Sequence, residues 1–424
     1  MRNRIAYQNV GLLVGPSPAY SFHSGQSATG EMSLAEFASS GQNLASSKLK
    51  QLNLVQNATF NFNIARTEIQ QIGGTNLVAR KALVQPDVSV GFSYLLSDGR
   101  NEDMLGFCHS GQNSAFLSGQ QNPSGDRNLF MVITDDQAED FNLQKNYENH
   151  SVLGFGNCFP ISYSLGASVG SLATASVEYL ASNVKFDTTS GSMAFQDSLG
   201  GEGIIGSGLI PAVNPIDGQI ASSHEYGYIL RSGDIMSSTT AGKIDEKNMG
   251  HSNSGDIHYL TPGDMEMSFK QTNVGGINLS GSDIMHIRNI EIDIPINRTD
   301  LCGFGSKYVH DRRAKFPGLG NMSISATANN IKDGNLNNVF SEDQEYDFTI
   351  TFLDPTGPKN SIGKPANKAV ELEITKARCQ SQSFSQSIGS NMEVQGSFTF
   401  ECTPTTGFKF SGIASTEISS RNND

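Results

Sequence analysis

Asn57-Ala-Thr-Phe-Asn-Phe-Asn-Ile-Ala-Arg-Thr-Glu68 is the stretch that decides the fold. Apolar side chains stand at every second position from Ala58 to Ile64, and polar side chains fill the positions between them. An alternation with period two predicts a β-strand with one apolar and one polar face. The same alternation recurs in residues 346–352 and 394–400. Helical spacing is rare, with the best cases at Leu34–Leu49 and one turn after Arg66, so the chain is expected to be mainly β.

A second copy of the first stretch lies 232 residues further along the chain. Asn289-Ile-Glu-Ile-Asp-Ile-Pro-Ile-Asn-Arg-Thr-Asp300 aligns with it without a gap, and the match continues to Arg80 and Arg312. In each copy an arginine follows the strand. Thr67 or Thr299 is placed to cap a short helical turn, with an acid at the positive end of that turn. Gly73 and Gly305 stand where the turn closes.

Looser matches continue in the same order. Residues 88–98 parallel 322–333, residues 128–135 parallel 346–354, and residues 158–180 parallel 379–401. A fixed order of blocks indicates a tandem duplication of one β module. The expected division is a polar leader (1–50), module one (51–184), a Gly/Ser-rich linker or insertion (185–284), module two (285–412) and a flexible tail (413–424). Module one also carries a long loop, Gly106–Arg127.

The composition excludes several classes of protein. The 424 residues contain 29 Lys+Arg and 42 Asp+Glu, a net charge of −13, so the basic footprint of a nucleic-acid-binding protein is missing. The apolar runs are too short for a membrane-spanning helix, and no secretory signal is visible at the start. The five scattered cysteines contain no Cys-x-x-Cys, so we expect free thiols in a reducing compartment rather than disulfides.

Catalytic and ligand-binding motifs are weak. Gly201-x-Gly203-x-x-Gly206 lacks the helix that would bind a pyrophosphate. Ser168 matches the sequence pattern of a nucleophile elbow, but the residues after it alternate like a strand, whereas the elbow needs a helix there. The eight histidines, His251 and His258 among them, do not have metal-ligand spacing. We therefore expect no enzyme activity, no cofactor and no metal; a β-sandwich glycan hydrolase, which needs two facing carboxylates, is the rival enzyme class.

Arg66 and Arg298 occupy the same position in the two copies, directly after a strand. Two interpretations are open. The first is an ion pair with the acid that follows, and the second is a contact between subunits. The planar fork of arginine suits either role.

Three motifs together resemble a known family. They are Asn63-Ile-Ala-Arg-Thr-Glu-Ile-Gln-Gln-Ile-Gly73, Val88-Ser-Val-Gly-Phe-Ser-Tyr94 with Asp98-Gly-Arg-Asn-Glu-Asp-Met-Leu-Gly106, and Gly156-Asn-Cys-Phe-Pro-Ile-Ser-Tyr-Ser-Leu-Gly166. The chain resembles the bacteriophage tail tube proteins, in the long form that carries two tube modules. The resemblance covers residues 51–184 and, more loosely, 285–402.

The resemblance implies two tandem tail-tube-like β-sandwich modules, each with a short helix. It implies a non-catalytic virion protein that forms trimeric, pseudo-hexameric rings stacked into a tube, through which double-stranded DNA passes. The implied partners are copies of the chain itself, the tape measure, the baseplate and the tail terminator, without a membrane. The implied location is the virion tail, assembled in the host cytoplasm. Closing strand edges across subunits would remove exposed edges.

Residues for these roles follow from the strand faces. Lumen-facing candidates are Thr59, Asn61, Glu291 and Asp293, whose faces could equally meet outer solvent or a neighbouring subunit. Structural or intersubunit candidates are Arg66, Thr67, Gly73, Arg298, Thr299 and Gly305, and the loop Gly106–Arg127 is the candidate for ring stacking. The alternatives are a baseplate hub, tube initiator or tail-completion protein with the same module, and a carbohydrate-binding β-sandwich adhesin.

Overall fold

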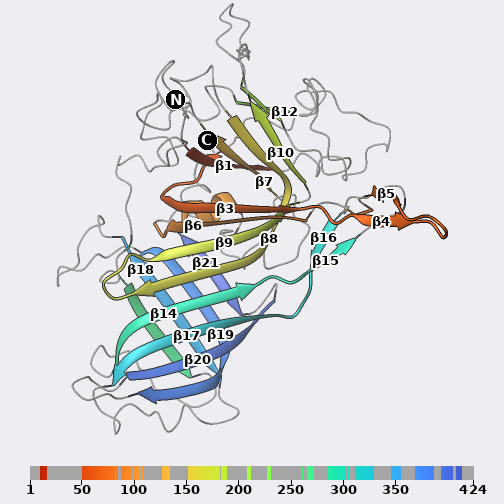
Figure 1. Cartoon of the computed structure of the whole chain (residues 1–424). Helices are drawn as coiled ribbons and strands as arrows, with labels where there is room; N and C mark the ends of the chain where they lie inside the picture. Colours follow the sequence, from red (N-terminus) through yellow and green to blue (C-terminus); the bar gives the residue numbers. More distant parts are fainter. Residues whose placement is uncertain are drawn as a thin grey trace, which may run out of the picture.

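The chain folds into a mainly β protein, as expected (Figure 1). In this computed structural model the described residues are 10–16, 50–81, 83–84, 87–97, 99–105, 107, 127–133, 151–181, 183–188, 208–211, 227–230, 260, 265–271, 285–301, 304, 311–328, 345–354, 368–385, 393–403 and 407–412.

The first half of the chain forms one β unit. Its elements are β1 (Val10–Pro16), β2 (Lys50–Gln51), β3 (Val55–Asn63), β4 (Thr67–Gln70), β5 (Leu77–Lys81), β6 (Asp87–Leu95), α2 (Arg100–Leu105), β7 (Arg127–Ile133), β8 (Ser151–Ser168), β9 (Thr174–Ala181) and β10 (Asn183–Thr188). All pairings are antiparallel, in the order β3-β6-β9-β8-β7-β1, with β10 on β8. The hairpin β4–β5 projects from this unit.

The second half has the same strand order. After a separate hairpin of β11 (Gly208–Pro211) and β12 (Gly227–Leu230), its elements are β13 (Met265–Gln271), β14 (Met285–Pro295), β15 (Arg298–Leu301), β16 (Asp311–Ala314), β17 (Gly318–Ala328), β18 (Tyr346–Leu353), β19 (Lys368–Ser385), β20 (Glu393–Cys402) and β21 (Phe408–Gly412). They pair as β14-β17-β20-β19-β18-β13, with β21 on β19 and the hairpin β15–β16 outside that order.

Matching β-bulges place the two halves in residue-by-residue register. The pairing of β8 with β9 shifts between Pro160 and Ser162, and the pairing of β19 with β20 shifts between Cys379 and Ser381. A bulge inserts one extra residue into a strand, so it marks a unique position in the ladder. Pro160 in the first half therefore corresponds to Cys379 in the second.

A pair of opposed side chains supports this register. Val88 lies opposite Ala181 in the first half, and the corresponding pair in the second half is Gly320 opposite Phe400. The ring of Phe400 fills the space above Gly320, where a Cβ atom would come within 2.4 Å of it. The large and small residues have exchanged strands, which keeps the packed volume of the site nearly constant.

Each half has two packed layers, because its longest strand belongs to both. The first part of β19 pairs with β18 and β21, and its last part pairs with β20. Near this change of partner Lys376 has φ 57°, and its N–H donates to Asp347 Oδ1 over 3.0 Å. The layers meet through apolar side chains; the rings of Phe348 and Phe398, for example, lie 5.0 Å apart.

The prediction of a short helical turn after Arg66 and after Arg298 is wrong. Both segments form β-hairpins, β4–β5 and β15–β16. Thr67 and Thr299 pair across their hairpins with Lys81 and Arg313 instead of capping a helix. A returning strand offers a full ladder of hydrogen bonds, which one isolated helical turn does not. Gly73 does close a turn, with φ +85° at the hairpin tip, whereas Gly305 lies outside the described residues.

The helix of the first half lies elsewhere. It is α2, within the quoted Asp98–Gly106 motif, and the described part of the second half contains no helix. The two β units also reach beyond the expected boundaries, because β1 lies within residues 1–50 and β13 within residues 185–284. Both strands lengthen a sheet by covering an edge, of β7 and β18 respectively. Leu34–Leu49 and nearly all of the loop Gly106–Arg127 lie outside the described residues.

Candidate functional site

Two strand edges are left open at corresponding places in the two halves. Within the described residues β3 pairs only with β6, although its counterpart β14 pairs with both β17 and β8. The end of β8 lies between β9 and β14, whereas the end of β19, Arg378–Ser385, pairs only with β20 in the described part of the chain. In the described part of the chain, one β3-type edge and one β19-type edge are therefore open, the two kinds of edge that β14 and β8 join internally.

The internal junction joins β14 to β8 along Asn289–Pro295 and Ser162–Ser168. Ile296 N–H donates to Ile161 O over 2.7 Å at one end, and Val169 N–H donates to Arg288 O over 2.8 Å at the other. Such a ladder makes one continuous sheet of the two halves. Its inward side chains, Ile290, Ile292 and Ile294, are fully buried.

The open strand β3 is less buried than β14. Phe60 and Phe62, expected on the inward face, are each 41% exposed, whereas the corresponding Ile292 and Ile294 are 1% and 0% exposed. Phe60 still contacts the core, with its ring 5.6 Å from that of Phe155. The difference follows from position, because an edge strand lacks the neighbour that covers a central strand.

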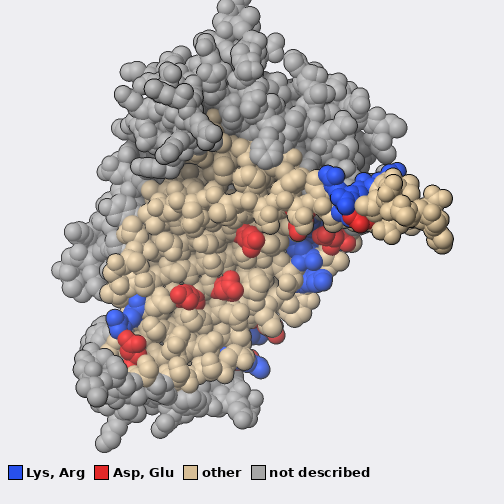
Figure 2. All heavy atoms as spheres, in the orientation of Figure 1, with Lys and Arg blue, Asp and Glu red and all other residues tan. Residues whose placement is uncertain are grey.

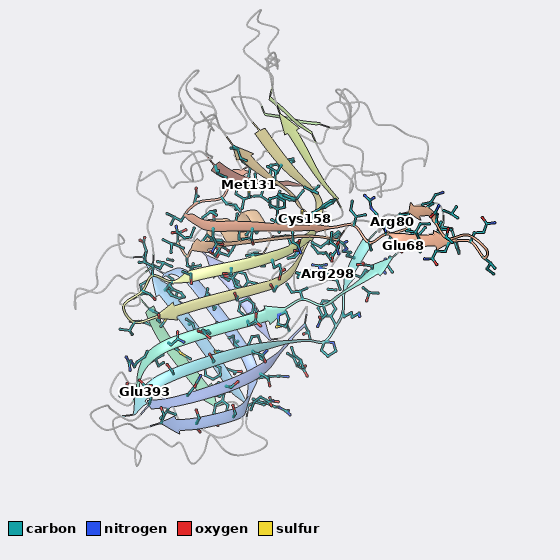
Figure 3. The ribbon with its side chains drawn as sticks, viewed as in Figure 1. Glu68, Arg80, Met131, Cys158, Arg298 and Glu393 are labelled. Carbon is teal, nitrogen blue, oxygen red and sulfur yellow. The ribbon has the colours of Figure 1, made fainter. Side chains whose placement is uncertain are left out.

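Two arginines of the β15–β16 hairpin join the second half to the first. Arg298 Nε donates to Pro160 O over 2.8 Å, and Arg312 Nη1 donates to Leu180 O over 2.9 Å. Both guanidinium groups lie over the ring of Phe159, at 5.2 and 5.8 Å from its centroid. Arginine suits this place because its planar fork stacks and donates at once. Figure 3 labels Arg298 close to Cys158, which lies in the middle of β8 two residues before Pro160.

The acid of this hairpin serves Arg312 and not Arg298. Arg312 Nε lies 3.2 Å from Asp300 Oδ1, and the Arg312 side chain is 1% exposed. Burial lowers the pKa of Arg312, while Asp300 opposes that shift. Of the two open interpretations, an ion pair of Arg298 with the following acid is therefore wrong. Arg298 instead bonds to carbonyl oxygens, including Arg312 O, at a junction between two β units of one chain.

The corresponding hairpin β4–β5 has no such contacts. It extends away from the body of the molecule (Figures 1 and 3). Glu68 and Arg80 form an ion pair of 2.8 Å in which the Arg80 side chain is 60% exposed. Arg66 is exposed and has no hydrogen bond or ion pair within the described residues. The tip of the β4–β5 hairpin is apolar, because Ile72 is fully exposed and Val78 is mostly exposed.

The polar faces of neighbouring strands in one sheet make up a common surface, and Figure 2 shows that few charged side chains lie on it. The lumen candidates Thr59 and Asn61 lie on it in β3, and Glu291 and Asp293 lie on it in β14. All four are exposed. The remaining positions are almost all Ser, Thr, Asn or Gln. The described charges on it are the acids Asp87, Glu178, Glu291, Asp293 and Glu401, the exposed Arg378 opposite Thr399, and a pair of Glu393 with Arg288 at one end.

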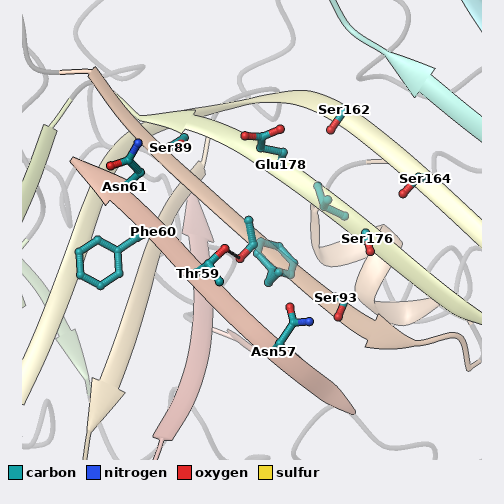
Figure 4. Close-up of a pocket in the computed structure, with 13 residues that line it drawn as sticks. Asn57, Thr59, Phe60, Asn61, Ser89, Ser93, Ser162, Ser164, Ser176 and Glu178 are labelled. Atoms are coloured by element: carbon teal, nitrogen blue, oxygen red, sulfur yellow. Dashed lines mark hydrogen bonds between the residues drawn. The ribbon is translucent and has the colours of Figure 1, made fainter. Parts of the chain in front are cut away.

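A shallow hollow of about 400 Å³ lies on this surface in the first half (Figure 4). Thr59 and Asn61 line it together with Ser89, Ser176 and Glu178. Thr59 Oγ1 donates to Gly91 O over 3.4 Å. The hollow has one carboxylate and many hydroxyl groups, so it presents no pair of carboxylates for glycan hydrolysis.

A buried polar cluster fixes α2 to the first half. Glu102, 1% exposed, accepts from Tyr94 Oη over 3.0 Å and from Tyr163 Oη over 3.5 Å. Burial, and then the charge of Glu102, raise the pKa of Tyr94 well above its usual value. Asn101 clamps the start of β3, since its side chain accepts from Asn53 N–H and donates to Asn53 O. Sequence reasoning missed these residues, because α2 (Arg-Asn-Glu-Asp-Met-Leu) is mostly polar and only the tertiary structure shows that Glu102 is buried.

The structure gives no support to the catalytic and metal-binding motifs that the sequence analysis set aside. Ser168 stands at the turn into β9 with its Oγ 2.6 Å from Ser171 Oγ, and a strand rather than a helix follows it. In the described residues no group of three His, Cys, Asp or Glu is placed to hold a metal ion. Gly201–Gly206, His251 and His258 lie outside the described residues. Nor does the described part contain a helix with the length and hydropathy of a membrane span.

The cysteines that can be placed carry free thiols. These are Cys158, Cys379 and Cys402, while Cys108 and Cys302 fall outside the described ranges. Burial raises the pKa of the Cys402 thiol to about 12, so it stays protonated at neutral pH. Burial also raises the pKa of the Cys379 thiol, so neither Cys379 nor Cys402 is an activated thiolate.

Comparison with known proteins gave a limited result. No protein-family model and no curated protein matches the sequence. Among solved structures, a chain of the PVC sheath-tube complex of an extracellular contractile injection system is 9% identical, with a TM-score of 0.25, covering 35% of this chain and 89% of that one. The SPP1 tail tube is 9% identical, with a TM-score of 0.25 and coverages of 36% and 79%. A tail chain of an empty GTA particle is 12% identical, with a TM-score of 0.23 and coverages of 36% and 98%. Values this low carry no statement about this chain's function.

Proposed function

We propose that this protein is a non-catalytic structural subunit that polymerises through its strand edges into rings and then into the tube of a phage tail. The observation that carries the proposal is the junction of β14 with β8 inside one chain, combined with the open edges of β3 and β19. A chain that already joins its halves by one type of edge pairing can join a second copy by the same pairing.

The register of that contact follows from the corresponding residues. Inside the chain Pro295 lies opposite Ser162 and Ile294 opposite Tyr163. The equivalent positions between copies are Asn63 opposite Ser381 and Phe62 opposite Gln382. This pairing would supply hydrogen-bond partners to both open edges and cover Phe60 and Phe62.

Ring size and stacking are the finer part of the proposal. Six modules per ring, as in the family that the sequence resembles, require three copies of a two-module chain. The continuous polar surface would then line the central channel, with Thr59, Asn61, Glu291 and Asp293 facing it. Hydroxyl, amide and carboxylate groups do not attract phosphate, so double-stranded DNA could pass without being held. The location is the virion tail, with assembly in the host cytoplasm and the tape measure, baseplate and terminator as partners.

The test is the assembly state of the purified full-length chain. We expect trimers or larger rings by sedimentation velocity, and rings or tubes with a central channel by electron microscopy. A chain that remains monomeric at high concentration, alone and with a tail-length template, would overturn the proposal. Counting copies in the virion separates a tube subunit, present in many copies, from a hub or tube initiator.

A further inference from the structure

The β4–β5 hairpin is a candidate for a second intersubunit contact, because its sequence repeats that of the docked β15–β16 hairpin. Position by position, Glu68 pairs across the hairpin with Arg80 as Asp300 does with Arg312. Arg66 stands directly before β4, as Arg298 stands at the start of β15. The acid–arginine pair is thus conserved between the two hairpins of the chain.

The two hairpins differ in what surrounds that pair. The Arg312 side chain is 1% exposed and is bonded to Leu180 O, whereas the Arg80 side chain is 60% exposed. A guanidinium held by one exposed carboxylate contributes little to stability, whereas a buried, fully bonded one is costly to disrupt. The β4–β5 hairpin therefore has the groups for docking without the surface on which to dock.

That surface exists on the second half of another copy. Phe159 lies opposite Leu180 one residue before the bulge of β8, and Arg378 lies opposite Thr399 one residue before the bulge of β19. Cys379 O thus corresponds to Pro160 O, the acceptor for Arg298, and Thr399 O corresponds to Leu180 O, the acceptor for Arg312. Cys379 O lies at the start of the open β19 edge, and Thr399 O lies in the neighbouring strand β20, opposite Arg378.

The geometry points to an arginine lock between copies of this chain, in which Arg66 donates to Cys379 O and Arg80 to Thr399 O of the next copy. The inference rests on the proposed function, since it places the β4–β5 hairpin beside the β3–β19 pairing. The hairpin meets a second copy in the same ring rather than the ring above.

The lock between copies differs from the internal one at a single central position. Phe159, on which both internal arginines stack, is replaced by Arg378, which pairs with Glu345 over 2.8 Å. A third cation in place of an aromatic ring removes the cation–π attraction and adds repulsion. The contact between copies is therefore weaker and more sensitive to salt than the contact within one copy.

Proximity is tested by cross-linking in assembled full-length protein. Thr67→Cys places a thiol on the hairpin while retaining both arginines, and Cys379 is the native thiol on the other copy; Cys108 and Cys302 are replaced by Ser. A short bis-maleimide should link copies into a ladder that ends at the ring size, and Cys379→Ser should abolish it. Rings that form without a Cys379-dependent link overturn the lock but leave the proposed function intact, whereas absence of rings in the unmodified chain overturns both.

The energetic test compares two cations of the same hairpin. Arg80→Ala should weaken association by about tenfold or more, because a hydrogen bond from a charged group is lost at each contact. Lys81→Ala is the matched control, since it removes the same charge at the exposed position that corresponds to Arg313, and it should change association less than about threefold. Equal effects of the two substitutions would overturn the lock, and circular dichroism verifies that both variants fold.

Discussion

The two halves of this chain have the same strand order but differ in what covers them. In the second half β14 lies between two strands and its hairpin is bonded to a neighbour, while in the first half β3 is open on one side and its hairpin is exposed. The sequences of the two segments hardly predict this difference. Equivalent residues thus adopt different environments because, among the described residues, only β14 has a neighbouring strand on that side.

The largest expected effect comes from blocking the open edge. Alternate residues of a strand direct their N–H groups to the same side. The N–H of Ile296 points toward β8, so the N–H of Ile294 points toward β8 as well. Phe62 corresponds to Ile294, so Phe62→Pro removes an outward N–H without removing a bond to β6. We expect a folded monomer, with association weakened by about 3 kcal/mol per contact, because the facing carbonyl loses its donor and the Phe62 ring is no longer buried. Sedimentation velocity measures it.

Phe62→Ala is the control for that variant, because it shortens the side chain and keeps the N–H. It should still form rings, with a weaker association than the native chain. If Phe62→Pro assembles as well as Phe62→Ala, β3 does not pair with another copy.

A pair of core truncations sharpens the comparison of β3 with β14. Ile292→Ala should lower the free energy of unfolding by about 3 kcal/mol, because the side chain is fully buried between strands. Phe60→Ala should cost the monomer about 1 kcal/mol, because its ring is partly exposed. Denaturant unfolding of unassembled protein gives both values. A larger loss for Phe60→Ala would contradict the assignment of β3 as an open edge.

The same comparison applies to the hairpins. Arg312→Ala should destabilise the chain by about 2 kcal/mol, because it removes the bond to Leu180 O and leaves Asp300 without its arginine. Arg80→Ala should change the stability of the unassembled chain by less than about 0.5 kcal/mol, since its ion pair is exposed. Thermal unfolding below the assembly concentration distinguishes the two.

Tyr94 provides a pH test of a feature that is described in the first half but not among the described residues of the second. The position that corresponds to Tyr94 in β17 is Ala326, and no acid equivalent to Glu102 is described there. Because the folded-state pKa of Tyr94 is raised above 10.0, the unfolded chain loses this proton first as the pH increases. Stability is therefore retained below pH 10 and falls above it, by about 1.4 kcal/mol per pH unit for one proton.

Tyr94→Phe removes that titration and one hydrogen bond to Glu102. It should cost about 1 kcal/mol at pH 7 and flatten the alkaline decrease in stability. Guanidinium unfolding at pH values from 7 to about 11 measures both effects. An unchanged alkaline slope would show that another group causes it.

The smallest effect on the fold should come from the polar surface. Glu291→Lys with Asp293→Lys should change unfolding stability by less than about 0.5 kcal/mol, since both side chains are exposed. In assembled protein the double variant should bind double-stranded DNA with an affinity that falls steeply with salt. Glu266→Lys with Glu373→Lys, outside this surface, is the charge-matched control. Equal DNA binding by both variants would contradict a channel lined by β14.

The sequence alone was enough for the class of fold and for the location of its best strands. Period-two alternation identified β3, β14, β18 and β20, because a strand exposes alternate residues whatever surrounds it. The same pattern placed Thr59, Asn61, Glu291 and Asp293 on polar faces, which the structure joins into one surface. Local chemistry also placed a turn at Gly73.

Tertiary structure alone decided which of these segments would have neighbours. The residues after Arg66 form a strand and not a helical turn, because residues 77–81 return to pair with them. Whether Phe62 or Ile294 is buried depends on the strand alongside, and whether Arg80 or Arg312 is bonded depends on a carbonyl group far away in sequence. Alternation reports the two faces of a strand, but hydrogen bonding along its edges is independent of side chains and leaves no pattern in the sequence.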